Sequence, residues 1–365
     1  MSPMTQTVQF ARSDLTQSRI VEGTLPPLGD GEVRLRIESF SVTANNVTYA
    51  VVGDAFGYWN FFPANAEPMG EWGVVPMWGH AVIEASNYPG LAVGERLYGY
   101  VPMASHLDVL PGGVTPGGFS DAAAHRLPMS PIYNQYSRLA ADPEHDPSRE
   151  AERMIFGPLF KTGFLIESMM RREGWFGAEQ LICTSASSKT AMATASVARE
   201  KLPQMRRIGL TSAGNVDFVR SGGFYDDVLS YDQAADLAQV PSVLVDFAGN
   251  AGIIHAVHSA LGDRLRYSCT VGATHVGAGF GRDNGALPGP KPVLFFAPDH
   301  AVAAIKELGP KAFGEAIAAS WQRFVSETVD TVRVDRRSGL EAAQAAFADT
   351  LAGQADPAVG IIIEP

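Results

Sequence analysis

Residues 180–202 read QLICTSASSKTAMATASVAREKL, and this stretch decides the fold of the chain. It predicts a strand over residues 180–187, because the run begins with apolar and β-branched residues. It predicts a helix over residues 189–202, where alanine, methionine and charged residues follow a serine pair suited to the start of a helix. A strand that turns tightly into a helix is the first half of a βαβ unit.

The same alternation continues along the chain. Further strands are predicted at 206–212, 227–231, 242–250, 267–273 and 292–298, with helical patterns between most of them. Continuous apolar strands separated by helices indicate a parallel sheet that is covered on both faces. We therefore predict a Rossmann-type α/β domain over residues 131–330, within which residues 131–155 form a polar linker or surface excursion.

The two ends of the chain have a different sequence pattern. Residues 1–130 contain short strands separated by glycine and proline, which predicts a small β-barrel or sandwich. Residues 331–365 add a strand, a helix and a strand, and we expect this tail to return to the first domain.

The loop after the first α/β strand is a candidate phosphate site. Ser187, Ser188 and Thr190 can donate hydroxyl hydrogen bonds, and Lys189 adds a positive charge at the helix N-terminus, where backbone N–H groups already favour an anion. Two other interpretations stay open. The serines can simply cap a surface helix, or the loop can imitate the end of a nucleotide-triphosphate loop, although both of that motif's glycines are missing here.

The end of the second strand indicates which dinucleotide is bound. NAD enzymes place an acidic residue there for the ribose hydroxyls. This chain instead has Thr211, Ser212 and Asn215, with no acid before Asp217. Short hydroxyl and amide donors suit a 2′-phosphate better, so we expect NADP(H).

Motifs along the whole chain resemble the medium-chain dehydrogenase/reductase superfamily, and within it the zinc-free quinone-oxidoreductase branch. They are GEVRLR at 31–36, GERLYG at 94–99, GGFSD at 117–121 and GIII at 360–363. The resemblance implies a GroES-like β-barrel domain beside the Rossmann domain. It also adds four candidate cofactor-binding residues: Thr162, Tyr231, Gly272 and Ala273.

The resemblance further points to catalytic residues near position 45. Tyr49 matches a family tyrosine and is the candidate proton donor, while Asn45 or Asn46 is the candidate polariser of the substrate. The other interpretation of Tyr49 is a buried strand aromatic. Zinc-dependent relatives need a cysteine, a Gly-His-Glu and a further cysteine or acid, whereas this chain has Gly-His-Ala around His80. We therefore expect no metal.

Residues 54–78 form a segment rich in aromatic residues and devoid of lysine and arginine. It can pack as an ordinary hydrophobic excursion, or it can line a site for a small apolar, flat substrate. Tyr58 and Trp59 are the candidate pocket residues.

Composition limits the remaining possibilities. The net charge of −11 argues against nucleic acid, and the absence of a long apolar run or leader pattern predicts a cytoplasmic protein with no membrane partner. Cys183 and Cys269 are expected to be buried free thiols rather than a disulfide. We expect a homodimer that uses NADPH to reduce a quinone or an α,β-unsaturated carbonyl compound. A nucleotide-using enzyme without net redox chemistry and an NADPH-sensing protein are the alternatives.

Overall fold

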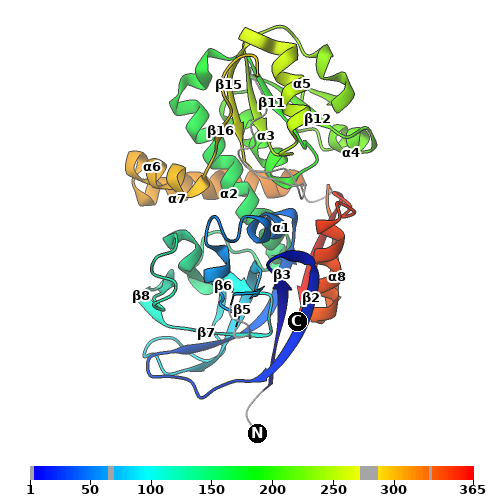
Figure 1. Ribbon diagram of the computed structural model, residues 1–365. Coiled ribbons are helices and arrows are strands. Elements are labelled where there is room, and N and C mark those ends of the chain that lie inside the picture. Colours follow the sequence, from blue (N-terminus) through cyan, green and yellow to red (C-terminus); the bar gives the residue numbers. More distant parts are fainter. Residues whose placement is uncertain (1–3, 65–69, 272–286, 329–330) are drawn as a thin grey trace. The chain divides into compact units, whose positions relative to one another are not determined.

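The computed structural model describes residues 4–64, 70–271, 287–328 and 331–365 (Figure 1). The chain forms two compact units. Unit 1 comprises Met1–Ile155 and Val334–Pro365, and unit 2 comprises Phe156–Arg333. Residues 131–155, which we assigned to the second domain, group instead with unit 1, because they add a strand to its main sheet and because Glu150 forms an ion pair with Arg96 on a strand of that sheet.

Unit 1 is an antiparallel β domain. A nine-stranded sheet runs in the order β17-β18-β3-β5-β6-β10-β9-β8, with β7 paired to β3, and a smaller sheet has the order β2-β1-β4. The elements of this unit are β1 (Met4–Ala11), β2 (Asp14–Thr24), β3 (Val33–Val42), α1 (Ala44–Val51), β4 (Trp72–Gly73), β5 (Pro76–Ser86), β6 (Arg96–Pro102), β7 (His106–Val109), β8 (Pro111–Thr115), β9 (Gly118–Asp121), β10 (Gln135–Arg138), β17 (Arg333–Ser338), α8 (Leu340–Leu351) and β18 (Val359–Glu364).

Strand β3 lies at the centre of this domain. Its side chains Val33, Leu35 and Ile37 point into the core and are buried, as the two-residue period of a strand requires. β3 pairs antiparallel with β5, β7 and β18. The C-terminal strand therefore completes a sheet that the N-terminal part of the chain begins.

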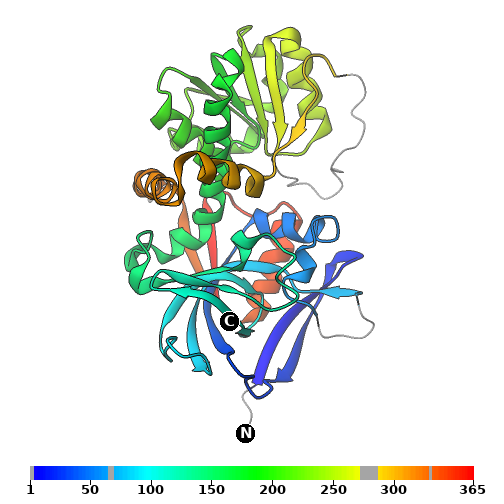
Figure 2. The same ribbon diagram turned by 90° about the vertical axis from the view of Figure 1, so that its left-hand side faces the viewer.

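Unit 2 is built on a six-stranded parallel sheet, with helices beside it (Figures 1 and 2). The order β13-β12-β11-β14-β15-β16 is the 3-2-1-4-5-6 order of a Rossmann domain. Its elements are β11 (Gln180–Cys183), α3 (Lys189–Lys201), β12 (Arg206–Thr211), α4 (Val216–Ser221), β13 (Asp227–Ser230), β14 (Ser242–Asp246), α5 (Ala251–Leu261), β15 (Leu265–Thr270), β16 (Val293–Leu294), α6 (Ala297–Leu308) and α7 (Pro310–Thr328).

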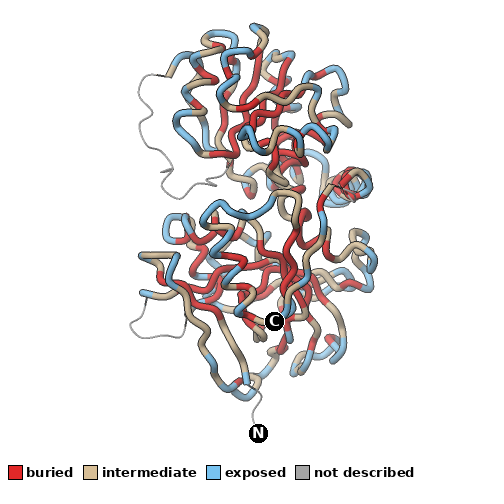
Figure 3. Tube along the Cα trace, turned by 90° about the vertical axis from the view of Figure 1, so that its right-hand side faces the viewer, coloured by how far each residue is buried: buried red, intermediate tan, exposed pale blue. Residues whose placement is uncertain are grey.

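The core of unit 2 follows the apolar runs of its central strands, and Figure 3 shows the buried residues gathered in the interior of the unit. Cys183 and Cys269 lie in this core as buried free thiols, as predicted. Within the described ranges, no helix is both long and apolar enough to cross a membrane.

The sequence did not predict helix α2 (Glu150–Arg172). Pro158 stands inside it, and Gly157 and Gly163 weaken the helical pattern further. Gly163 is needed for packing against α3, because a Cβ at this position would lie 2.7 Å from the backbone nitrogen of Thr194. The tertiary contact therefore outweighs the local propensity.

Candidate cofactor and catalytic sites

The predicted phosphate loop begins where β11 ends. Ser188 is the N-cap of α3, and its Oγ accepts a hydrogen bond from the backbone N–H of Ala191 at 3.3 Å. Lys189 is the first residue of the helix, and Thr190 lies in its first turn. The first N–H groups of a helix have no partner within it and attract negative charge. The loop therefore combines a helix N-terminus, a lysine and several hydroxyl groups.

Ser185 holds the backbone conformation that a glycine usually takes. Its φ of 46° lies in the left-handed region, which costs a residue with a side chain about 1–2 kcal/mol. The N–H of Ser185 donates to the Tyr231 hydroxyl at 3.1 Å, and the Tyr225 hydroxyl donates to the carbonyl of Ala186 at 3.3 Å. Tyr225 and Tyr231, which flank β13, thus hold the strained loop in a shape that usually requires glycines.

The end of β12 lies beside this loop. Asn215 Nδ2 donates to Ser187 Oγ at 3.3 Å, and Ser212 is exposed at the start of a short 3-10 turn. Thr211 is buried, and its hydroxyl has no hydrogen-bond partner within the described ranges. The nearest acid in sequence, Asp217, is exposed and pairs with Arg220. The structure therefore brings Ser187 and Asn215 together with no carboxylate between them.

Sequence reasoning missed Asp246, at the end of β14. It is fully buried and accepts a hydrogen bond from Thr184 Oγ1 at 2.5 Å and one from the N–H of Gly249 at 2.9 Å. Asp246 thus ties the loop after β11 to the loop after β14. An acid that ends the apolar run SVLVD was the available signal.

Three further residues were expected at the cofactor from the resemblance. Thr162 is half-buried on α2, where its hydroxyl donates to the carbonyl of Pro158 at 3.1 Å. Gly272 and Ala273 lie outside the described residues.

Unit 1 contains a group of aromatic side chains that we call the tyrosine cluster: Tyr49, Tyr58, Trp78, Tyr100 and Tyr133. The rings of Tyr49 and Tyr58 are 4.6 Å apart, and the Tyr58 and Tyr133 hydroxyls are 3.1 Å apart. Our second interpretation placed Tyr49 on a strand, but it lies on helix α1. The cluster is assembled from residues that are up to 84 positions apart in the chain, from Tyr49 to Tyr133.

The hydroxyl of Tyr49 has a defined orientation. Its oxygen accepts hydrogen bonds from Asn45 Nδ2 at 2.7 Å and from Trp78 Nε1 at 3.1 Å. Because the phenol oxygen uses both of its acceptor positions for these bonds, the O–H points away from Asn45 and Trp78. Burial raises the pKa of Tyr49 well above its ordinary value of 10.0, so the group keeps its proton at neutral pH.

Two other predicted residues have packing roles. The Asn46 side chain is buried, accepts a hydrogen bond from the backbone N–H of Thr43 at 2.7 Å and donates to the carbonyl of Pro76 at 2.9 Å. It therefore caps α1, and Asn45 is the asparagine beside Tyr49. Trp59 lies in the main core of unit 1. Its ring packs directly against Gly53 and Gly73, so a Cβ at either of these positions would clash with the ring. Tyr58 is thus the only one of the two pocket candidates found in the tyrosine cluster.

Comparison with known proteins identifies the family. Residues 40–356 match the family described as "Protein of unknown function (DUF2855)". The chain belongs to the DUF2855 family. No curated protein matches the sequence.

Solved structures share the fold of this DUF2855 chain. CurA from Vibrio vulnificus, in complex with NADPH, is 15% identical with a TM-score of 0.60, and the match covers 98% of both chains. Etr1p, in complex with NADP and crotonyl-CoA, is 11% identical over 100% of both chains with a TM-score of 0.59. The yhdH oxidoreductase from Salmonella enterica, in complex with NADP, is 14% identical over 99% of both chains with a TM-score of 0.55. These likenesses confirm the predicted fold class.

Proposed function

We propose that this DUF2855 chain is a zinc-independent oxidoreductase that uses NADPH to reduce a quinone or an α,β-unsaturated carbonyl compound. The observation that carries the proposal is the loop of residues 184–191 in unit 2, which we call the serine loop. It places Lys189 at the first position of α3, and the neighbouring end of β12 has no acidic residue. Structures of the same fold that were solved with NADPH or NADP support this choice of cofactor.

The residues of the loop suit a pyrophosphate. Ser187, Ser188 and Thr190 would donate hydroxyl hydrogen bonds, and Lys189 would add a charge-assisted one beside the helix N-terminus. Ser212 and Asn215 would hold the 2′-phosphate, since both can donate hydrogen bonds and neither repels it. When bound, NADPH supplies the hydride.

The chain itself must supply a proton when a carbonyl-conjugated double bond or a quinone is reduced. Tyr49 can do this, because two N–H donors hold its oxygen, its O–H remains available as a donor, and burial keeps the phenol neutral. The surrounding rings of Tyr58, Tyr100 and Tyr133 suit a small, flat and apolar substrate.

An assay of NADPH oxidation with a panel of quinones and enones tests the proposal. We expect at least one substrate to be turned over, and NADPH to bind more tightly than NADH in a fluorescence titration. Tighter binding of NADH would contradict the assignment of Ser212 and Asn215.

A second function is an NADPH-binding protein without redox chemistry. The observation that favours it is the burial of Tyr49, which is only 5% exposed in unit 1. Tight binding of NADPH, with no NADPH oxidation in the presence of any quinone or enone of the panel, would support this second function.

A further inference from the structure

Another cluster of ionisable side chains lies in unit 1, and the proposed reaction does not use it. His80 stands on β5, His145 lies in the loop before α2, and Glu150 is the first residue of α2. One ligand atom from each residue lies within 4.8 Å of the other two. Two imidazoles and a carboxylate are ligands that zinc and related divalent ions accept.

The histidines have nitrogen atoms that lack partners. His80 is fully buried, and neither of its ring nitrogens has a hydrogen-bond partner within the described part of the chain. The Nδ1 of His145 is also buried and unpaired there, while its Nε2 lies 3.8 Å from Glu150 Oε1. An unpaired buried polar atom costs about 1–3 kcal/mol, so such a group calls for a bound partner.

Two of the three side chains have shifted pKa values. Burial lowers the pKa of His80 to about 3. Burial opposes ionisation of Glu150, but the hydrogen bonds from Arg96 and the charges of Arg96, His80 and His145 together outweigh it and lower the carboxyl pKa.

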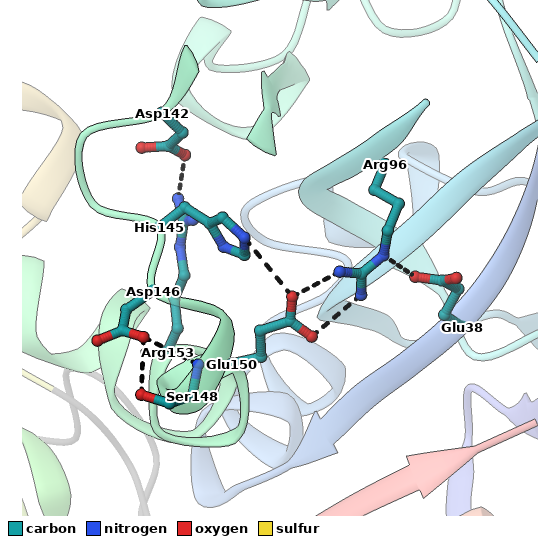
Figure 4. Close-up of polar contacts among 8 residues, drawn as sticks. All are labelled: Glu38, Arg96, Asp142, His145, Asp146, Ser148, Glu150 and Arg153. Carbon is teal, nitrogen blue, oxygen red and sulfur yellow. Dashed lines mark hydrogen bonds and ion pairs between the residues drawn. The ribbon is translucent and has the colours of Figure 1, made fainter. Parts of the chain in front are cut away.

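Arg96 holds the carboxylate in place from the side away from His145 (Figure 4). It donates to both oxygens of Glu150, at 2.7 and 3.0 Å, and to Glu38 at 2.7 Å. Hydrogen-bonded partners of this kind orient a ligating carboxylate.

The charged side chains beside the cluster are paired. Arg153 pairs with Asp142 at 2.5 Å close to His145 (Figure 4). Glu38 and Asp142 balance the guanidinium groups of Arg96 and Arg153, so the remaining negative charge is that of Glu150 itself.

We propose that His80, His145 and Glu150 bind one divalent metal ion of the zinc type, with a fourth position open to water. The ion would link β5 to the start of α2. Zinc ligands at about 2.1 Å from the ion lie about 3.4 Å from one another, so ligand atoms within 4.8 Å would approach one another by at most about 1.4 Å around it. This proposal departs from the sequence prediction, which was that the protein binds no metal. That prediction rested on the ligand set of zinc-dependent relatives. Two of the three ligands proposed here lie outside that set, and their approach depends on the tertiary structure.

Metal titration of the full chain, stripped with a chelator, tests this site. We expect one Zn²⁺ per chain by calorimetry, and a visible absorption band of low-coordinate Co²⁺. His145→Ala should weaken Zn²⁺ binding by more than the 10–100-fold that is typical of losing an outer-shell partner. His145 is suited to this test because it lies in a loop, so its replacement should leave the fold intact.

His106→Ala is the matched control. His106 lies in the same unit but outside the cluster. Its Nε2 lies 3.5 Å from Glu84 Oε2, so it also forms a histidine–carboxylate pair. This variant should bind Zn²⁺ as the unmodified chain does. Zn²⁺ should also raise the melting temperature of the unmodified chain and of His106→Ala, and not that of His145→Ala. Absence of binding, or equal binding in His145→Ala, overturns the proposal. Neither result depends on NADPH or on turnover.

Discussion

The serine loop of unit 2 and the tyrosine cluster of unit 1 are built in opposite ways. The loop is local: residues 184–191 lie together in the sequence, and its polar groups are backbone amides and short hydroxyls at a helix N-terminus. The cluster is nonlocal, because helix α1, strands β5 and β6 and the segment around Tyr133 each supply a ring. A helix N-terminus attracts an anion whichever small residues surround it. The Tyr49 hydroxyl, in contrast, is oriented only because separate elements of the fold meet around it.

The largest effect is expected in the tyrosine cluster. Tyr49→Phe removes the proposed proton donor and should lower kcat by about 10²–10⁴-fold, while NADPH affinity stays unchanged. Steady-state kinetics and cofactor titration measure the two quantities. Since burial raises the pKa of Tyr49 above 10.0, no loss of kcat from its deprotonation should occur below pH 10.

Tyr136→Phe is the control for this variant. Tyr136 is a buried tyrosine of the same unit, and its hydroxyl donates to the carbonyl of Tyr100 at 2.6 Å. Its removal should cost about 1 kcal/mol of stability and leave kcat unchanged. Full activity of Tyr49→Phe would mean that the cluster serves packing alone.

A smaller effect is expected in the serine loop. Lys189→Ala should weaken NADPH binding by roughly tenfold to a hundredfold, because a charge-assisted hydrogen bond is worth about 1.5–3 kcal/mol. The stability of the free protein should change by less than about 1 kcal/mol. Fluorescence titration and thermal unfolding measure these changes.

Lys201→Ala is the matched control, since Lys201 lies at the other end of the same helix. It should keep the affinity for NADPH. A lower melting temperature of Lys189→Ala with intact NADPH affinity would show that Lys189 serves the fold. Loss of NADPH affinity without loss of NADH affinity would place the lysine on the 2′-phosphate.

Trp78→Phe sharpens the comparison within the cluster. It removes one of the two N–H donors to Tyr49 and keeps most of the ring contacts. Losing a neutral hydrogen bond of about 0.5–1.5 kcal/mol should lower kcat by roughly twofold to tenfold, with little change in KM. Equal loss of kcat in Trp78→Phe and in Tyr49→Phe would mean that the indole N–H is as essential as the phenol, and not merely a group that orients it.

The smallest effect is expected at Ser185. Ser185→Gly relieves the left-handed backbone and should change the free energy of unfolding by at most about 1 kcal/mol in the stabilising direction, since the greater freedom of glycine in the unfolded chain offsets part of the gain. Thermal unfolding measures it. A destabilised variant with weaker NADPH binding would show that the Ser185 side chain itself is needed in the loop.

Much of unit 2 could be predicted from the sequence. The strands that begin at Gln180, Arg206, Asp227 and Ser242 start where the apolar runs start. Each ends one to four residues earlier than predicted, because polar and small residues at the carboxyl ends leave the sheet and form loops. The predicted boundary near residue 130 was wrong, since the segment that follows it pairs with the strands of unit 1.

The sequence by itself determined the alternation of strands and helices, the helix N-terminus at Ser188 and the acid-free end of β12, because each depends on neighbouring residues. Only the tertiary structure decided which asparagine lies beside Tyr49, that Trp59 belongs to the core, and that Asp246 ties two loops together. It also brought His80 within reach of His145. Apart from the pair of Asn45 and Tyr49, which lies within one helix, these contacts join residues far apart in the chain, and their geometry follows from how elements pair and pack, which a local pattern does not encode.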